Sequence, residues 1–186
     1  DEHDQNSAYT KVLDASEGEN TIVMFKSCFP NSQIEGSPED TAAEGEGLTV
    51  SNAKYIYNDI LKYFATKPDK LFIVVTAPPV SAEEYSANAR AFNNWLVNDW
   101  LDENHYTKKN VAVFDFYNVL TAKDNHHRYN NGVIEHITDT GGDTSFYPTD
   151  GEDDHPSVKG SQKATKEFVP WLNIMTHCWQ GDGGCP

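Results

Sequence analysis

The sequence has little positive charge and no long hydrophobic run. Its 186 residues include 14 Lys and Arg against 29 Asp and Glu, which gives a formal net charge of -15. A chain this acidic repels phosphate backbones and anionic lipid, so we expect neither nucleic acid nor membrane as a partner. No apolar stretch approaches the roughly 20 residues that span a bilayer, and residues 1–10 do not resemble a signal peptide. We therefore expect any secretion signal to have been removed already.

Cysteine is scarce, with three residues in the chain. Cys178 and Cys185 flank a glycine-containing stretch that can turn back on itself, which predicts a short disulfide loop formed in an oxidising compartment. Cys28 follows an apolar strand pattern, and we expect it to be unpaired and buried. The sequence has no second close cysteine pair and no zinc-finger spacing of histidines, so we expect no cysteine-based zinc site. The disulfide and the acidic composition favour an extracellular, secreted protein.

The length and composition suit one domain with a proper core. With 38% hydrophobic and 12% aromatic residues, the chain can bury a single core but has no room for two large ones. We expect one α/β domain over 1–177 and a short cysteine-bearing tail over 178–186.

Three short apolar runs, rich in β-branched and aromatic residues, predict strands. They are TIVMF at 21–25, LFIVVTA at 71–77 and VAVFDF at 111–116. Because the runs are continuous rather than alternating, we expect each strand to be covered on both faces, as in a parallel sheet.

Apolar residues at helical spacing predict helices between and after these strands. The first helix is expected at about 50–66, and the second is expected to be capped by Ser81. The third is expected to begin near Ser157 and to end before Pro170 or continue past it with a kink. This alternation predicts a three-layer α/β sandwich with functional groups at the carboxyl ends of the strands.

The connection after the third strand is unusually long and carries several histidines. We expect a functional or mobile loop that brings His155 to the same rim of the sheet as Asn31. Within it, His126, His127 and His136 lack the partners for a metal site, and we interpret them as surface residues.

The stretch GEDDHPSVKGSQ at residues 151–162 supports two interpretations. A carboxylate two or three residues before a histidine can reach its ring nitrogen and fix its tautomer, so Glu152 or Asp153 is suited to orient His155. Alternatively, the stretch is a solvated acidic turn that leads into a helix capped by Ser157.

The order of these pieces resembles the SGNH or GDSL hydrolases, a superfamily of esterases and acetylesterases with a flavodoxin-like sheet. The resemblance rests on four segments, which are IVMFKSCFPNS, VVTAPP, VAVFDFYNVL and DDHPSVKGSQKATKEF. It implies that Asn31 donates to the oxyanion and that His155 is the catalytic base. The family's acid usually lies three residues before the histidine, which is the position of Glu152, while Asp153 lies two before it.

The family's nucleophilic serine follows a strand that precedes the asparagine block. Residues 1–20 contain no apolar strand, so we interpret Ser7 and Ser16 as surface loop residues. Ser27 and Cys28 lie at the correct rim but at the position of the asparagine block. We therefore expect a flavodoxin-like fold that lacks its first strands, with the nucleophile on a missing front segment.

We expect an extracellular ester hydrolase that acts on a small-molecule or carbohydrate ester, with no cofactor and no metal. The alternative is a non-catalytic structural or carbohydrate-binding module on the same fold. The run at 21–25 contains no charge and no proline, so as a bare sheet edge it would invite association. We therefore expect it to pair on its second side with a strand of another polypeptide or of another copy of the chain.

Overall fold

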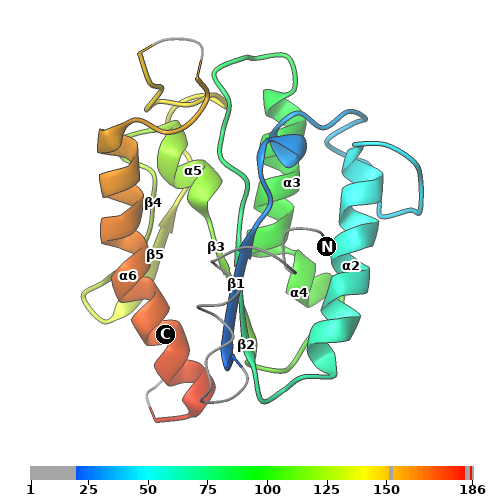
Figure 1. The fold of residues 1–186 in the computed structure, drawn as a ribbon, viewed down its shortest axis with the longest axis vertical. Coiled ribbons are helices and arrows are strands. Elements are labelled where there is room, and N and C mark those ends of the chain that lie inside the picture. The colour runs from blue at the N-terminus through cyan, green and yellow to red at the C-terminus, as the bar shows by residue number, and fades with distance from the viewer. Residues whose placement is uncertain (1–19, 151–152, 183–184, 186) are drawn as a thin grey trace, which may run out of the picture.

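A computed structural model describes residues 20–150, 153–182 and 185, and it shows an α/β fold built on a three-stranded parallel sheet (Figure 1). The elements in chain order are β1 (Ile22–Lys26), the 3-10 helix η1 (Phe29–Ser32), α2 (Val50–Ala65), β2 (Leu71–Val75), α3 (Ser86–Asn98), α4 (Trp100–Glu103), β3 (Val111–Phe114), α5 (Phe116–Thr121), β4 (His126–Asn130), β5 (Val133–Ile137) and α6 (Val158–Gln180). The predicted α/β class is therefore confirmed.

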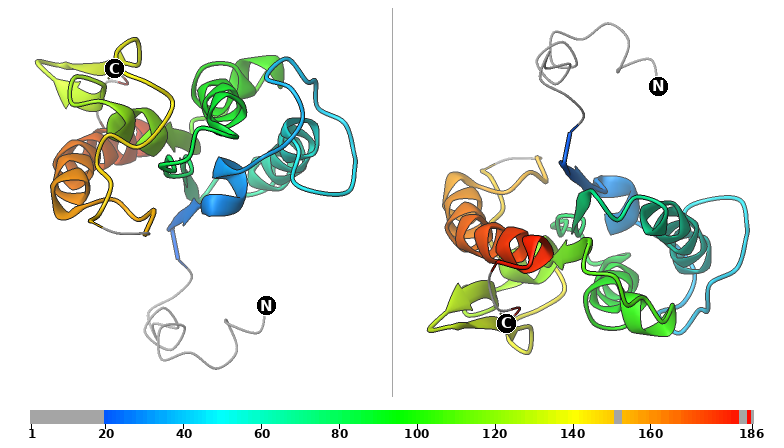
Figure 2. Two further views of the ribbon diagram at one scale, coloured as in Figure 1. Left: turned by 90° about the horizontal axis from the view of Figure 1, so that it is seen from above. Right: turned by 90° about the horizontal axis from the view of Figure 1, so that it is seen from below.

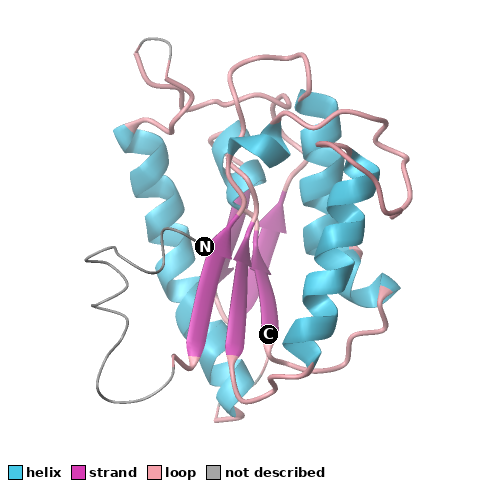
Figure 3. Ribbon diagram, turned by 45° about the vertical axis from the view of Figure 1, so that its right-hand side comes forward, coloured by secondary structure: helices cyan, strands magenta, loops and turns pink. Residues whose placement is uncertain are grey.

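The sheet has the order β1-β2-β3, with both pairs parallel. Ile22 lies opposite Leu71, and Phe72 lies opposite Val111. Because all three strands run the same way, their carboxyl ends meet at one edge of the sheet, as Figure 3 shows. The loops that follow the strands are thereby gathered on one rim.

Helices cover both faces of the sheet (Figure 2). On one face, α2, α3 and α4 pack on alternate strand residues such as Phe72 and Val74. On the other face, α5 and α6 pack on the residues between them, such as Ile73 and Val75. The predicted first helix is confirmed, and Thr49 caps it by accepting a hydrogen bond from the Asn52 amide. All five residues of β2 are buried, as the continuous apolar run predicts.

β1 departs from the expected burial. Ile22 and Met24 are 40% and 58% exposed, so the prediction that both faces of this strand are covered is wrong for this chain. Within the described residues β1 pairs with β2 alone, and it therefore forms an open edge of the sheet.

One helix boundary and one cysteine also differ from expectation, whereas the last helix follows one of its two predicted courses. α3 begins at Ser86 rather than near Ser81, because Ser81 lies in the loop before it and its amide is bonded elsewhere. α6 starts at the predicted Ser157 cap and continues past Pro170. The disulfide between Cys178 and Cys185 is confirmed, whereas Cys28 is free and exposed, because it follows an edge strand.

The long connection after β3 is more ordered than its sequence predicts. It contains α5 and an antiparallel hairpin of β4 and β5, which turns through Asn131 and Gly132 at positive φ. Asparagine and glycine tolerate this left-handed backbone, which suits a tight hairpin turn. β4 packs against α6, so the hairpin lies beside the last helix (Figure 1). None of the described helices is long and apolar enough to cross a membrane.

Candidate functional site

An Asp–His pair lies in the loop before α6. The Asp153 Oδ1 atom accepts a hydrogen bond from the His155 ring nitrogen Nδ1 and a second one, at 2.9 Å, from the His155 backbone amide. These bonds, the backbone one foremost, lower the pKa of the Asp153 carboxyl. The side chains are 60% and 68% exposed. Glu152, the other proposed partner of His155, lies outside the described residues.

The His155 ring contacts the helix that carries Asn31. Phe29, the first residue of η1, meets the His155 ring edge-on with a centroid separation of 5.2 Å. Asn31 lies two residues further along the same short helix. Residues far apart in the sequence are thus brought to one rim, at the carboxyl end of β1.

Asn31 itself faces the α2 side of the sheet. It lines a cavity of about 270 Å³ together with Ser27 and Tyr57, and His155 is not among the lining residues. Burial raises the pKa of the Tyr57 hydroxyl to about 12, although hydrogen bonds with the Ser27 and Asn31 side chains act in the opposite direction. Asn31 is half-buried and lies beside this phenol.

Two parts of the rim, the helix η1 and the loop that carries the Asp–His pair, are bonded to the segment that follows β2. Residues 76–80 are buried throughout. The Ser32 hydroxyl donates to the Pro78 carbonyl, which ties η1 to this segment. The Ser81 amide donates to Asp154 Oδ1 at 2.9 Å, which ties the loop of the Asp–His pair to the end of the same segment.

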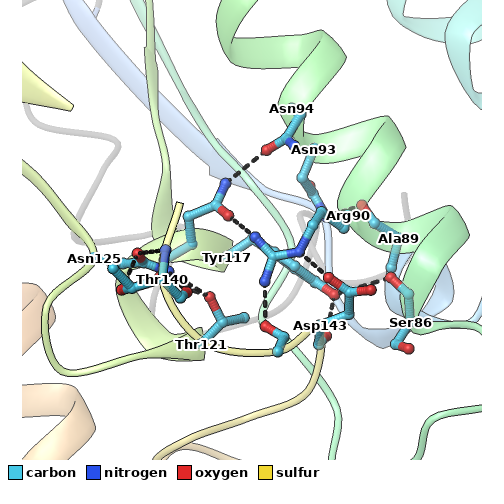
Figure 4. Close-up of polar contacts among 12 residues, drawn as sticks. Ser86, Ala89, Arg90, Asn93, Asn94, Tyr117, Thr121, Asn125, Thr140 and Asp143 are labelled. Atoms are coloured by element: carbon cyan, nitrogen blue, oxygen red, sulfur yellow. Dashed lines mark hydrogen bonds and ion pairs between the residues drawn. The ribbon is translucent and has the colours of Figure 1, made fainter. Parts of the chain in front are cut away.

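Arg90 on α3 fixes the chain that returns from the hairpin toward His155 (Figure 4). Its guanidinium donates to the Asp143 carboxylate, the Asn118 side chain and the Gly142 carbonyl. The Tyr117 hydroxyl also donates to the Asp143 backbone carbonyl. A planar guanidinium that donates to three acceptors holds them in a fixed arrangement. These hydrogen bonds hold residues 142–143 of the long connection against α3.

Of the hairpin histidines, His127 is buried and His126 and His136 are half-buried, and all three make polar contacts, so their assignment as surface residues is wrong. His136 Nε2 lies 2.7 Å from Asp115 Oδ2, and His126 Nδ1 lies 2.8 Å from Glu167 Oε1. His127 accepts a hydrogen bond from the Asp115 backbone amide at 2.8 Å. The packing of β4 against α6 explains this burial, which the isolated sequence does not reveal.

Charge in this cluster is controlled by burial and pairing. Burial lowers the pKa of His127 to about 4, against an ordinary value of 6.5. Burial alone would raise the pKa of Asp115, but the hydrogen bond and charge of His136 outweigh it and hold that pKa below its usual value. The contacts of the cluster pair its histidines with the carboxylates of Asp115 and Glu167. In the part of the chain that the structure describes, no group of three or more His, Cys, Asp or Glu is arranged to hold a metal ion.

Sequence reasoning missed Phe29, Tyr57, Arg90 and Asp154. Asp154 adjoins Asp153 in the acidic run, but sequence alone does not separate the one that binds His155 from the one that binds Ser81. Arg90 belongs to no sequence motif, and its role depends on three contacts that form only in the folded chain. Searches against family models, curated proteins and solved structures find no match for this chain.

Proposed function

We propose that the protein is an SGNH-like ester hydrolase in which His155 is the general base. The observation that carries the proposal is the hydrogen-bonded pair of Asp153 and His155, placed at the rim beside the helix of Asn31. A carboxylate on one ring nitrogen and an open position at the other is the arrangement that acyl transfer requires of its base.

The proton path follows from this geometry. With its Nδ1 proton donated to Asp153, the neutral His155 ring accepts a proton at Nε2 from an attacking hydroxyl. The hydroxyl oxygen bonds to the acyl carbon as the proton leaves, and the ring then returns that proton to the departing alcohol. Water repeats the cycle and releases the acid. Asp153 stays ionised throughout, because its pKa lies below the ordinary value.

Asn31 is proposed as the oxyanion donor. An amide N–H aimed at the developing negative charge is a strong source of transition-state stabilisation when the donor is fixed in advance. The support for this role is the place of Asn31 in the short helix η1, whose Ser32 is bonded to the Pro78 carbonyl.

The nucleophile is proposed to come from a strand that pairs with the open edge of β1. Ser27 is at the rim beside Asn31 and Tyr57, but it lies at the position of the asparagine block rather than at that of the family's nucleophile. A parallel strand added beside β1 would end at the same rim and would place its next residue there. That strand lies outside the described residues, on a front segment or on a second polypeptide.

Two cavities beside β1 support the added strand. One, of about 270 Å³, lies between β1 and α6 and is lined by residues such as Met24, Phe114 and Phe168. The other, of similar size, lies between β1 and α2 and is lined by residues such as Phe25 and Ile56. Because strand side chains alternate between faces, one strand with apolar residues on both faces fits both cavities.

The substrate is proposed to be a neutral ester, such as an acylated carbohydrate, met outside cells. Asp150, Glu83 and Glu84 are exposed near the rim, and this charge disfavours anionic substrates. The disulfide at the end of α6 is consistent with an oxidising, extracellular compartment.

Substitution of His155 tests the proposal. His155→Ala removes the base and should lower kcat for p-nitrophenyl acetate and for an acetylated oligosaccharide by about 10²–10⁴-fold, with unchanged circular dichroism. The control is His177→Ala, which removes an exposed histidine that also contacts an aspartate but lies in the last turn of α6. Equal losses in the two variants, or none in either, would refute His155 as the base.

A further inference from the structure

The loop that carries the Asp153–His155 pair is tied to the sheet by a residue that the proposed reaction does not use. Asp154 lies between the two members of the pair, and its carboxylate accepts the hydrogen bond from the Ser81 amide at 2.9 Å. Asp153 and His155 are exposed, whereas Asp154 is half-buried. The loop thus turns two functional side chains outward and one anchoring side chain inward.

Main-chain bonds fix the start of this loop, because the Ser145 amide donates to the Val80 carbonyl and the Phe146 amide to the Leu120 carbonyl, each at 2.9 Å. Two further contacts shape the turn that carries the pair. The Thr149 hydroxyl donates to the Asp153 carbonyl at 2.6 Å, and a bridge joins Pro148 to Pro156. Both contacts are internal to the loop, so they move with it. Ser81, by contrast, directly follows the buried residues 76–80, which are held by the sheet.

We propose that Asp154 is a positioning residue that sets the place of His155 relative to Asn31; its catalytic consequence rests on the proposed ester hydrolysis. Ser32 binds the Pro78 carbonyl in the same buried segment, so the helix of Asn31 and the loop of His155 share one anchor. Removal of the Asp154 bond leaves Asn31 in place and releases His155 from Phe29. Displacement of a catalytic group by about 1 Å costs about 100-fold in rate.

The ring contact provides a test that needs no activity. Nuclear Overhauser effects between the Phe29 and His155 rings, whose centroids lie 5.2 Å apart, should be present in the unsubstituted protein and lost in Asp154→Ala. Asp154→Asn keeps an acceptor for Ser81 and should retain them. Asp150→Ala, which removes an exposed acid of the same loop, should also retain them. Persistence of the ring contact in Asp154→Ala would overturn the inference.

Kinetics test the catalytic consequence. For ester hydrolysis we expect Asp154→Ala to lower kcat at least tenfold with KM within twofold, and Asp154→Asn and Asp150→Ala to stay near the unsubstituted rate. An unchanged kcat in Asp154→Ala would overturn the positioning role. Absence of hydrolysis by the unsubstituted protein, produced together with the segment that supplies the nucleophile, would instead overturn the proposed function, and the ring contact would then decide whether Asp154 holds His155.

Discussion

At the scale of single residues, the histidines of this chain differ because their surroundings differ. His155 is exposed and bound to a carboxylate two positions away, so its ring stays accessible and oriented. His127 is buried, stacks on Phe114 with centroids 5.3 Å apart, and accepts from the Asp115 amide. The first environment suits proton transfer, whereas the second opposes protonation.

The buried His127 should make stability depend on pH. Its folded pKa of about 4 lies below the ordinary value of 6.5, so the unfolded chain binds the proton first as pH falls. The free energy of unfolding should therefore decrease between pH 6.5 and 4, by up to roughly 3 kcal/mol. Asp115 acts in a separate window, because its lowered pKa contributes stability that is lost only in more acidic solution.

His127→Phe tests this source of pH dependence. The phenyl ring preserves the stacking on Phe114 and does not titrate, so the fall in unfolding free energy between pH 6.5 and 4 should be smaller than in the unsubstituted protein. The variant also leaves the Asp115 amide without its acceptor, which should cost about 1–3 kcal/mol at pH 7. Urea denaturation at several pH values measures both effects. Identical pH slopes in the two proteins would contradict the assignment.

At the scale of elements, the sequence predicted those helices and caps that depend on neighbouring residues. The spacing of apolar residues located α2, and Ser157 marked the start of α6, because caps and amphipathic stripes are read within a few residues. The Asp153–His155 contact was also local. The hairpin was missed because its faces are decided by α6, whose residues are distant in sequence. The three hydrogen bonds of Arg90 were missed for the same reason, because their acceptors are distant in sequence.

The close packing of α6 against the loop before it depends on Gly160, which has no side chain. A Cβ atom at Gly160 would lie 2.7 Å from Tyr147 Cβ and 3.2 Å from Leu120 Cδ2. Gly160→Ala should therefore push α6 from the Tyr147 loop and destabilise the fold by about 1–3 kcal/mol, less a gain of up to about 1 kcal/mol in helix propensity. Thermal denaturation should show a lower Tm. Gly142→Ala is the control, because nothing lies within 4 Å of its added Cβ, and an equal Tm in the two variants would refute close packing at Gly160.

At the scale of the whole molecule, helices cover both faces of the sheet, but the outer edge of β1 is unpaired within the described residues. The exposed Met24 lies on this edge, with a cavity on each side of the strand. Residues 22–25 of this strand carry no charge and no proline, and Lys26 at its end is its one charged residue, so the stretch before Lys26 is a template for pairing. The formal net charge of -15 opposes association of such edges between copies of the chain.

The most direct test of the central claim is covalent labelling of the protein produced from its complete gene with a fluorophosphonate. The activated serine oxygen bonds to phosphorus and fluoride leaves, so mass spectrometry of the peptides identifies the nucleophile. We predict one modified serine outside residues 1–186. Its labelling should be lost in His155→Ala and in Met24→Lys, which places a charge on the open edge, and kept in His177→Ala. A label on Ser27, or labelling that survives His155→Ala, would contradict the account.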